Sequence, residues 1–185
     1  MNKWVNENGD LISHESIGKS FEDRDIDAYI LTNTKSNVVK PKILLTSMMH
    51  AREPAGLTVV MYFMQKLVED YKKNDARAKY ILDNREVWVI PFVNPDGYVD
   101  NEQNGKMRRK NMRDTCPRDK SLGGVDLNRN FAYKYKHTTD KCDEEYAGEG
   151  PFSEPETKAL KDLVEKHVFL SALHFHSYGM WFFFF

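Results

Sequence analysis

The chain has 185 residues, which is typical of one domain or part of one and is long enough to bury a hydrophobic core. Hydrophobic residues make up 41% of the chain and aromatic residues 12%, which favours a globular protein over a disordered one. The formal net charge of −1 lacks the basic excess of nucleic-acid binders, and no apolar run reaches the roughly 20 residues of a membrane span. We therefore expect neither nucleic acid nor a membrane as a partner.

The first half of the chain alternates predicted strands and helices. Two short apolar segments favour strands, at residues 27–33 and 42–48. Pro54 suits the first turn of a helix, where N–H groups have no partner, and apolar residues then recur at helical spacing to residue 73. A short helix near residues 75–83 and a strand over residues 86–94 follow, and Asn94-Pro95-Asp96-Gly97 predicts a turn.

The second half begins with a long segment that lacks a regular pattern. Residues 95–150 are rich in Gly, Asn, Arg and Lys, and a loop of that length inside a compact domain commonly carries function. Ser153 with Glu156 three residues later forms a capping box, which predicts a helix over residues 153–167. Residues 168–176 favour a strand. Strands that alternate with helices predict an α/β fold.

Two predicted strands end in side chains that could bind a metal ion. His50 and Glu53 follow the strand at 42–48, and in open α/β sheets ligands bind at the carboxyl ends of strands. Two histidines and one glutamate are a known ligand set for catalytic zinc. His174 and His176 end another strand and share a face, so either could be the third ligand. The alternative is an ordinary polar loop in which Glu53 favours a helix N-terminus electrostatically.

The long central segment holds two further candidate features. Five cations lie within residues 105–114 and allow three interpretations: a solvated surface, a nucleic-acid patch, which the balanced charge disfavours, or an arginine that stabilises an oxyanion. Asn128 and Arg129 are adjacent, and an arginine fork beside an amide suits a carboxylate. Cys116 and Cys142 flank the loop at 115–145 and are either a disulfide of an oxidising compartment or two free thiols.

Six segments occur in the order found in zinc carboxypeptidases of the pancreatic A and B type, and the chain resembles that family over essentially its whole length. They are HAREP at 50–54, NPDGY at 94–98, RRKN at 108–111, GVDLNRNF at 124–131, GPFSEPET at 150–157 and HSYG at 176–179. The resemblance implies a three-layer α/β sandwich, with a mixed, mostly parallel central sheet and helices on both faces. It also implies one zinc ion per chain as cofactor.

By this resemblance the zinc ligands are His50, Glu53 and His176, and His174 has a structural role. Asp126 matches the residue that orients a ligand histidine through its second ring nitrogen. The resemblance therefore implies a metallocarboxypeptidase, a hydrolase that removes C-terminal residues from peptides and proteins.

The remaining site residues are also assigned by the resemblance. Arg109 matches the arginine that polarises the scissile carbonyl and stabilises its oxyanion. Asn128 and Arg129 match the pair that binds the terminal carboxylate of the substrate, while Arg52 and Tyr178 match positions that line the substrate cleft. The expected partners are thus the C-termini of peptides or proteins, and the expected oligomeric state is a monomer.

The resemblance bears on the cysteines and on localisation as well. Cys116 and Cys142 lie near a disulfide found in secreted members of the family, which favours the disulfide interpretation. A secreted or lumenal location is implied in the same way, although residues 1–16 contain no apolar signal-peptide core.

The chain departs from the family pattern just beyond the third metal ligand. The family domain continues with segments that supply a glutamate general base, a tyrosine that closes over the substrate, and the specificity pocket. We therefore expect residues 1–185 to be a partial catalytic domain that lacks its C-terminal part, with activity at least about 100-fold lower. Two alternative functions remain: an inactive zinc- or peptide-binding pseudo-enzyme, and a deacylase of N-acylated amino acids.

Overall fold

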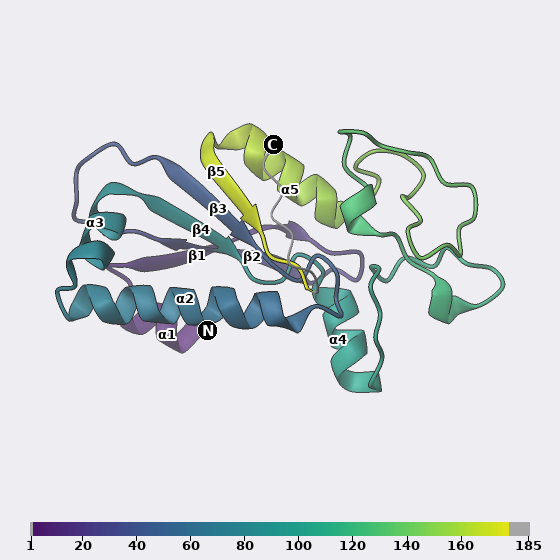
Figure 1. Ribbon diagram of the computed structural model, residues 1–185, viewed down its shortest axis with the longest axis horizontal. Helices are drawn as coiled ribbons and strands as arrows, with labels where there is room; N and C mark the ends of the chain where they lie inside the picture. The colour runs from purple at the N-terminus through teal and green to yellow at the C-terminus, as the bar shows by residue number, and fades with distance from the viewer. Residues whose placement is uncertain (1, 178–185) are drawn as a thin grey trace.

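A mixed five-stranded sheet forms the centre of the molecule in this computed structural model, which describes residues 2–177 (Figure 1). The order of its strands is β1-β2-β4-β3-β5. The β1/β2 and β2/β4 pairs are antiparallel, whereas β3 is parallel to both β4 and β5. The strands are β1 (Ile12–Lys19), β2 (Asp25–Leu31), β3 (Lys42–Thr46), β4 (Glu86–Ile90) and β5 (Phe169–His174). The mixed α/β sheet implied by the family resemblance is confirmed, although the described strand pairs are two parallel and two antiparallel and thus not mostly parallel.

The register of the parallel strands brings their carboxyl ends to one edge of the sheet. Thr46 at the end of β3 pairs with Ile90 of β4 and with His174 of β5. The segments that follow these three strands therefore begin side by side, and the candidate ligands lie in two of them. This arrangement is the one in which open α/β sheets place their ligands.

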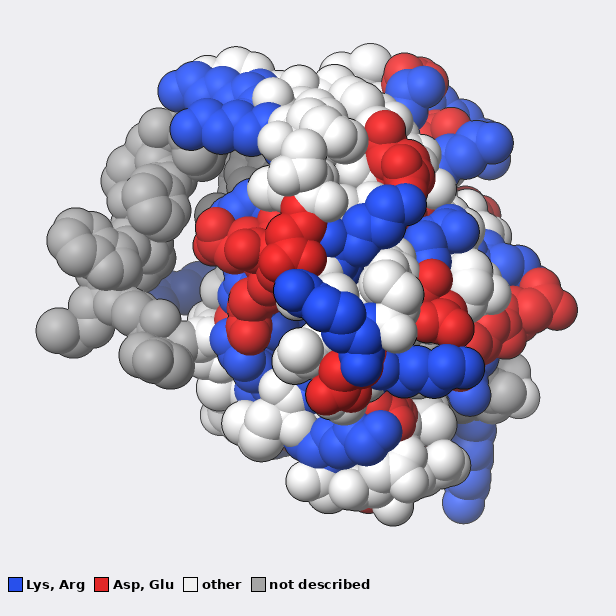
Figure 2. Space-filling view, turned by 90° about the vertical axis from the view of Figure 1, so that its right-hand side faces the viewer, with Lys and Arg blue, Asp and Glu red and all other residues white. Residues whose placement is uncertain are grey.

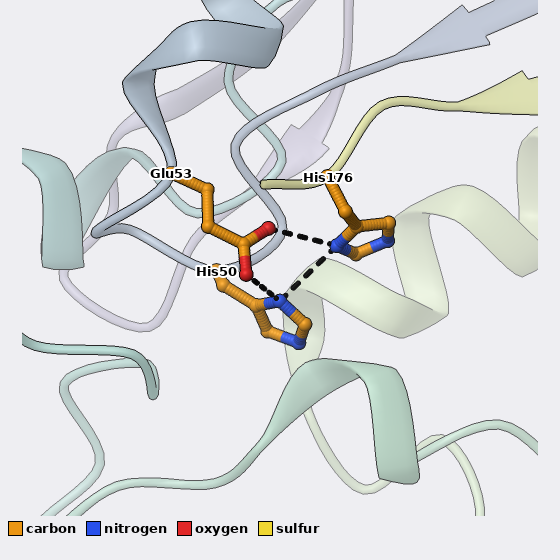
Figure 3. Close-up of side chains that lie close together, drawn as sticks. All are labelled: His50, Glu53 and His176. Carbon is orange, nitrogen blue, oxygen red and sulfur yellow. Dashed lines mark hydrogen bonds and ion pairs between the residues drawn. The ribbon is translucent and has the colours of Figure 1, made fainter. Parts of the chain in front are cut away.

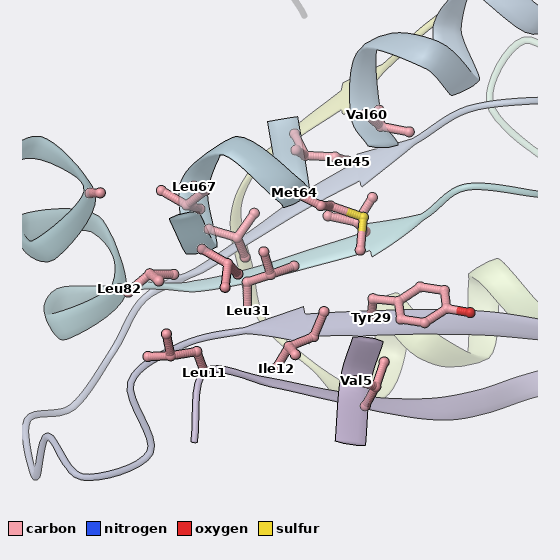
Figure 4. Close-up of a cluster of buried hydrophobic side chains, with 14 residues drawn as sticks. Val5, Leu11, Ile12, Tyr29, Leu31, Leu45, Val60, Met64, Leu67 and Leu82 are labelled. Carbon is pink, nitrogen blue, oxygen red and sulfur yellow. The ribbon is translucent and has the colours of Figure 1, made fainter. Parts of the chain in front are cut away.

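Helices cover both faces of the sheet (Figure 1). On one face lie α1 (Asn2–Glu7), α2 (Pro54–Lys72) and α3 (Ala76–Asn84), and on the other lies α5 (Pro155–Lys166). Side chains of α2 pack with Leu45 in one core cluster (Figure 4), and side chains of α5 pack with Leu44 in the other. Neighbouring residues of β3 thus point to opposite faces, as the period of two requires. No helix within residues 2–177 has the length and apolarity needed to cross a membrane.

Strand β5 forms one edge of the sheet in the described part of the chain. Its Leu170 and Leu173 side chains are 70% and 53% exposed, and Val168 just before the strand is 90% exposed. Exposed apolar side chains along a sheet edge leave that edge available for further packing or pairing.

Three elements differ from the sequence-based expectations. Helix α4 (Pro95–Asn104) occupies a region predicted to be a turn and loop. The Asn94 side chain accepts a hydrogen bond from Gly97 N–H, and Pro95 begins the helix, so the same residues that favour a turn here start a helix. Helix α1 and strand β1 were not predicted, because their short, largely polar sequences lack a clear apolar period.

The predicted capping box before α5 was wrong. The helix begins at Pro155, and Glu154 rather than Ser153 precedes it without a capping hydrogen bond from its side chain. The Glu156 carboxylate does not reach back to the helix start. It is fully buried and accepts hydrogen bonds from Phe21 N–H and from the Asn111 amide. Tertiary contacts have therefore replaced the local hydrogen bond that the sequence pattern suggests.

Candidate metal centre

Three side chains converge at the carboxyl end of the sheet (Figure 3). His50 Nδ1 lies 2.8 Å from Glu53 Oε1 and 3.1 Å from His176 Nδ1. His176 Nδ1 in turn lies 2.9 Å from Glu53 Oε2. His50 and Glu53 come from the turn between β3 and α2, and His176 follows β5, so segments distant in sequence complete one cluster.

Backbone contacts fix where these three side chains begin. Phe175 N–H extends the β3/β5 pairing by donating to Thr46 O at 2.8 Å, which holds the residue before His176 against the strand that leads to His50. On the other side, Gly56 in the first turn of α2 abuts Phe175. A Cβ at position 56 would lie 3.0 Å from both the Cβ and the carbonyl oxygen of Phe175. The absent side chain thus permits the close approach of α2 to this segment.

The cluster is largely buried and strongly polar. His50 is 3% exposed and Glu53 7%, whereas 31% of the His176 side chain remains exposed. Burial alone would raise the pKa of Glu53, but hydrogen bonds from His176 and His50 outweigh it and hold that pKa at about 2. Burial lowers the pKa of His50, but its contacts with Asp126 and Glu53 shift the pKa upward overall. The carboxylate is therefore ionised and available as a ligand.

The atoms that converge fit a zinc ion. Two imidazole nitrogens and a carboxylate all direct lone pairs at one point, so protons or a cation must lie between them. Tetrahedral zinc with bonds of roughly 2.0–2.2 Å would hold its ligand atoms about 3.3–3.5 Å apart. The separations of 2.8, 2.9 and 3.1 Å are a little shorter, so small side-chain shifts would admit the ion. The donor set, two nitrogens and one oxygen, is a zinc set that leaves a fourth position open.

Asp126 supports the cluster from behind. Its Oδ1 lies 3.2 Å from His50 Nε2, close but poorly aligned for a hydrogen bond, and Nδ1 of the same ring faces Glu53 and His176. Its Oδ2 accepts hydrogen bonds from Nε and Nη2 of Arg109 at 3.0 and 2.9 Å. Burial raises the pKa of Asp126, but its contacts with His50 and Arg109 more than offset this and lower it. An ionised Asp126 thus contacts both His50 and Arg109.

Arg109 borders the three ligand atoms. Its Nη1 lies 3.2 Å from His50 Nδ1 and 3.8 Å from Glu53 Oε1. Its position depends on Asn111, whose backbone N–H donates to Val125 O and whose side-chain oxygen accepts from Val125 N–H. These two hydrogen bonds join the chain segment that contains Arg109 to the segment that contains Asp126. A guanidinium N–H is therefore held at the edge of the cluster formed by His50, Glu53 and His176.

The other arginines with assigned roles are paired with acidic side chains. Asn128 and Arg129 lie in a short 3-10 helix (Leu127–Arg129) that begins after Asp126, and both are exposed. Arg129 Nη2 lies 2.5 Å from Glu145 Oε1, and Arg52 Nη1 lies 2.7 Å from Glu144 Oε1. Asn128 and Arg129 thus lie next to Asp126, and Arg52 lies next to Glu53. The guanidinium groups of Arg52 and Arg129 both face carboxylates.

A hollow of about 300 Å³ opens beside Arg109, which borders the cluster of His50, Glu53 and His176. Arg52, Arg109 and Glu144 line it together with Met107 and Leu122. A larger hollow of about 640 Å³ is lined by residues of α1 and by Tyr71 and Lys72 at the far end of α2. Helix α2 is 19 residues long, so that end lies roughly 27 Å from the start of the helix near Glu53. The smaller hollow is the one adjacent to the candidate chemistry.

The remaining predicted residues fall in three places. His174 Nδ1 lies 2.7 Å from Thr46 Oγ1, so His174 contacts the neighbouring strand instead of the ligand cluster. Cys116 and Cys142 form a disulfide that closes a loop over a sequence separation of 26. Tyr178 lies outside the described residues.

Sequence reasoning missed Asn111, Glu144 and Glu145. Asn111 lies within a segment that carries the family resemblance, so its position could have indicated it, whereas Glu144 and Glu145 lie between two such segments. Their partners could not be inferred, because the contacts join distant parts of the loop. Asn111 donates to buried Glu154 and Glu156, which lie more than 40 residues away.

Comparison with known proteins gives a consistent family assignment. Residues 1–185 match the family model described as zinc carboxypeptidase. The chain is 34% identical to mouse carboxypeptidase A4 over 175 residues, covering 92% of this chain and 40% of that protein. It is also 34% identical to an inactive metallocarboxypeptidase (ECM14) of Saccharomyces cerevisiae over 177 residues, covering 91% of this chain and 40% of that protein.

A solved structure shows the same fold. The crystal structure of thrombin activatable fibrinolysis inhibitor superposes with a TM-score of 0.85 at 26% identity. The match covers 96% of this chain and 45% of the solved chain. The chain thus spans 40% to 45% of the length of these three proteins.

Proposed function

Because this chain belongs to the zinc carboxypeptidase family, we propose that it provides the metal centre and carboxylate-binding residues of a zinc-dependent carboxypeptidase. The reaction would release C-terminal residues from peptides. The observation that carries the proposal is the convergence of His50, Glu53 and His176 beside Arg109. These four side chains come from three separate segments of the chain and lie at the carboxyl end of the sheet.

Zinc is the proposed cofactor, held by Nδ1 of His50, a carboxylate oxygen of Glu53 and Nδ1 of His176. When bound, zinc supplies Lewis-acid polarisation of a carbonyl and lowers the pKa of a water molecule to about 7. Asp126 keeps the His50 ring oriented with Nδ1 toward the metal position. The ionised state of Glu53 at neutral pH follows from its pKa of about 2.

Arg109 is proposed to stabilise the negative charge that develops on the scissile carbonyl oxygen. Two of its nitrogens are held by Asp126, so the guanidinium is oriented before substrate binds. Its remaining N–H groups face the ligand cluster at 3.2 Å from His50 Nδ1. Pre-oriented donors of this kind stabilise a transition state without having to reorganise, and losing one costs roughly 100- to 1,000-fold in turnover.

Asn128 and Arg129 are proposed to bind the terminal carboxylate of the substrate, with Arg52 along the same cleft. A guanidinium fork pairs with a carboxylate through two parallel hydrogen bonds, which gives both affinity and orientation. Recognition of that group would confine cleavage to the last peptide bond. A peptide with an amidated C-terminus would lose this contact.

A second candidate function is zinc or peptide binding without turnover. The similarity to an inactive metallocarboxypeptidase favours it. Within residues 2–177, the carboxylates that contact the ligand histidines are Glu53, itself a proposed ligand, and Asp126, which is engaged by Arg109. Neither is free to accept a proton from an attacking water molecule.

The test combines zinc content with peptide hydrolysis. Zinc would be measured by equilibrium dialysis for the parent chain, His50→Ala and His174→Ala, the last as a matched control that alters a histidine outside the cluster. We expect one zinc per parent and control chain and none in His50→Ala. Retention of zinc by His50→Ala, or its loss in His174→Ala, would contradict the proposed ligand set.

Hydrolysis then separates the two candidate functions. Peptides with free C-termini would be compared with the same peptides carrying C-terminal amides. Cleavage confined to free C-termini supports the carboxypeptidase, whereas bound zinc without turnover of either set supports the binding function. Cleavage of both sets alike would contradict the role of Asn128 and Arg129.

A further inference from the structure

Two consecutive glutamates each pair with an arginine beside the metal cluster. Glu144 contacts Arg52 at 2.7 Å, and Glu145 contacts Arg129 at 2.5 Å. Figure 2 views the molecule from the side of the long loop, and acidic and basic side chains alternate across this face. The two groups proposed to recognise substrate are therefore already bound to carboxylates of the protein itself.

The backbone around Glu145 is held firmly. Its N–H donates to the Asp143 side chain at 2.7 Å, and the carbonyl of the next residue, Tyr146, accepts from Asp126 N–H at 2.8 Å. Asp126 also caps the 3-10 helix that ends at Arg129. The hydrogen bond between Asp126 and Tyr146 thus holds together the two segments that carry Arg129 and Glu145. Their side chains meet close to Asp126, which contacts the proposed ligand His50.

The side chains themselves remain exchangeable with solvent. Arg129 keeps 40% of its side chain exposed and Glu145 keeps 57%. Ion pairs exposed to this degree contribute only about 0.2–1 kcal/mol, so an incoming anion can replace one partner. A peptide's terminal carboxylate is chemically the same group as the Glu145 side chain.

We infer that Glu145 is an internal carboxylate that occupies Arg129 until the terminal carboxylate of a peptide replaces it, an inference that rests on the proposed function of Arg129. Every ligand with a free C-terminus must then displace Glu145, whereas an amidated ligand gains nothing at this position. Glu145 therefore reduces the discrimination between free and amidated C-termini. Binding depends correspondingly more on contacts with the rest of the peptide.

The predicted effect follows from the strength of an exposed pair. Removing the charge of Glu145 frees Arg129, so ligands with a carboxylate should bind about two- to fivefold more tightly. Their amides should bind with unchanged affinity. If Glu145 instead serves only to orient the guanidinium, the same substitution would weaken binding of the carboxylates.

The test uses N-acetylphenylalanine and N-acetylarginine, each as free acid and as amide, titrated into the full chain by calorimetry. The variants are Glu145→Gln, Arg129→Gln and Asp114→Asn. Asp114 pairs with Lys120 at 3.5 Å and is 64% exposed, so its substitution removes the same charge from the surface without touching Arg129. Circular dichroism spectra would verify that each variant is folded.

The outcomes separate this inference from the proposed function. The inference is supported by two results together: Glu145→Gln binds the acids more tightly but not the amides, and Arg129→Gln no longer prefers acids to amides. If Arg129→Gln leaves acid binding unchanged, the proposed role of Arg129 fails and this inference fails with it. If Arg129→Gln abolishes the preference but Glu145→Gln leaves acid binding unchanged or weaker, only the inference is overturned. Equal tightening by Glu145→Gln and Asp114→Asn would also overturn it, since charge in general would be responsible.

Discussion

The disulfide between Cys116 and Cys142 should stabilise the loop that carries Asp126 and Arg129. It closes a segment with a sequence separation of 26. In the chain-entropy treatment, cross-linking a loop of that length restricts the unfolded state by ~3.5 kcal/mol at 25 °C. The double variant Cys116→Ala/Cys142→Ala should therefore lower the free energy of unfolding by about that amount, and the midpoint of thermal unfolding by roughly 7–14 °C.

The assay is urea unfolding followed by circular dichroism, on the oxidised chain, the same chain reduced with dithiothreitol, and the double variant. Both cysteines are buried, so replacing them with alanine also removes buried sulfur atoms. The reduced chain keeps these atoms and therefore shows the effect of the cross-link alone. Zinc binding should persist in all three samples, since the proposed ligands lie outside the cross-linked loop.

Two results would refute the reasoning. A change in unfolding free energy below about 1 kcal/mol on reduction would mean that the loop is ordered by its other contacts, chiefly the buried Asn111 and Asn130 amides. Loss of zinc binding on reduction would mean that the loop and the ligand cluster fold as one unit, contrary to the local role assigned to the disulfide.

Further predictions concern helix α5, helix α2 and the metal. Burial raises the pKa of Glu156 above its ordinary 4.5, so the folded state holds a proton that the unfolded state releases. The free energy of unfolding should therefore fall as the pH rises above about 4.5. Glu156→Gln should lessen this fall in urea midpoints between pH 4 and pH 8, whereas Glu165→Gln on the exposed side of the same helix should not. Gly56→Ala should place a Cβ 3.0 Å from Phe175 and cost about 1–3 kcal/mol, despite the higher helix propensity of alanine; an unchanged unfolding midpoint and zinc affinity would contradict this. Zinc at 100 times its dissociation constant should stabilise the chain by about 2.7 kcal/mol, and a chelator should reverse the shift in melting temperature.

Local sequence patterns predicted the elements that build the candidate site. The apolar segment before Thr46 and the proline at position 54 predict a strand followed by a helix, and the structure has both. Patterns with two possible outcomes were less informative. Asn94 and Pro95 suit a turn and a helix start equally, and the neighbouring chain decided in favour of a helix. Ser153 and Glu156 suit a capping box, yet burial against Asn111 removed Glu156 from that role.

The sequence by itself determined which residue types stand at the carboxyl ends of the strands, because periodicity and turn chemistry are local properties. The placement of His50, Glu53 and His176 within 3.1 Å of one another required the parallel pairing of β3 with β5, which joins segments more than 120 residues apart. The partners of the exposed charges were decided only by the tertiary structure. Arg129 faces Glu145 because the path of the loop through the disulfide and Asp126 brings them together, and no local pattern encodes that path.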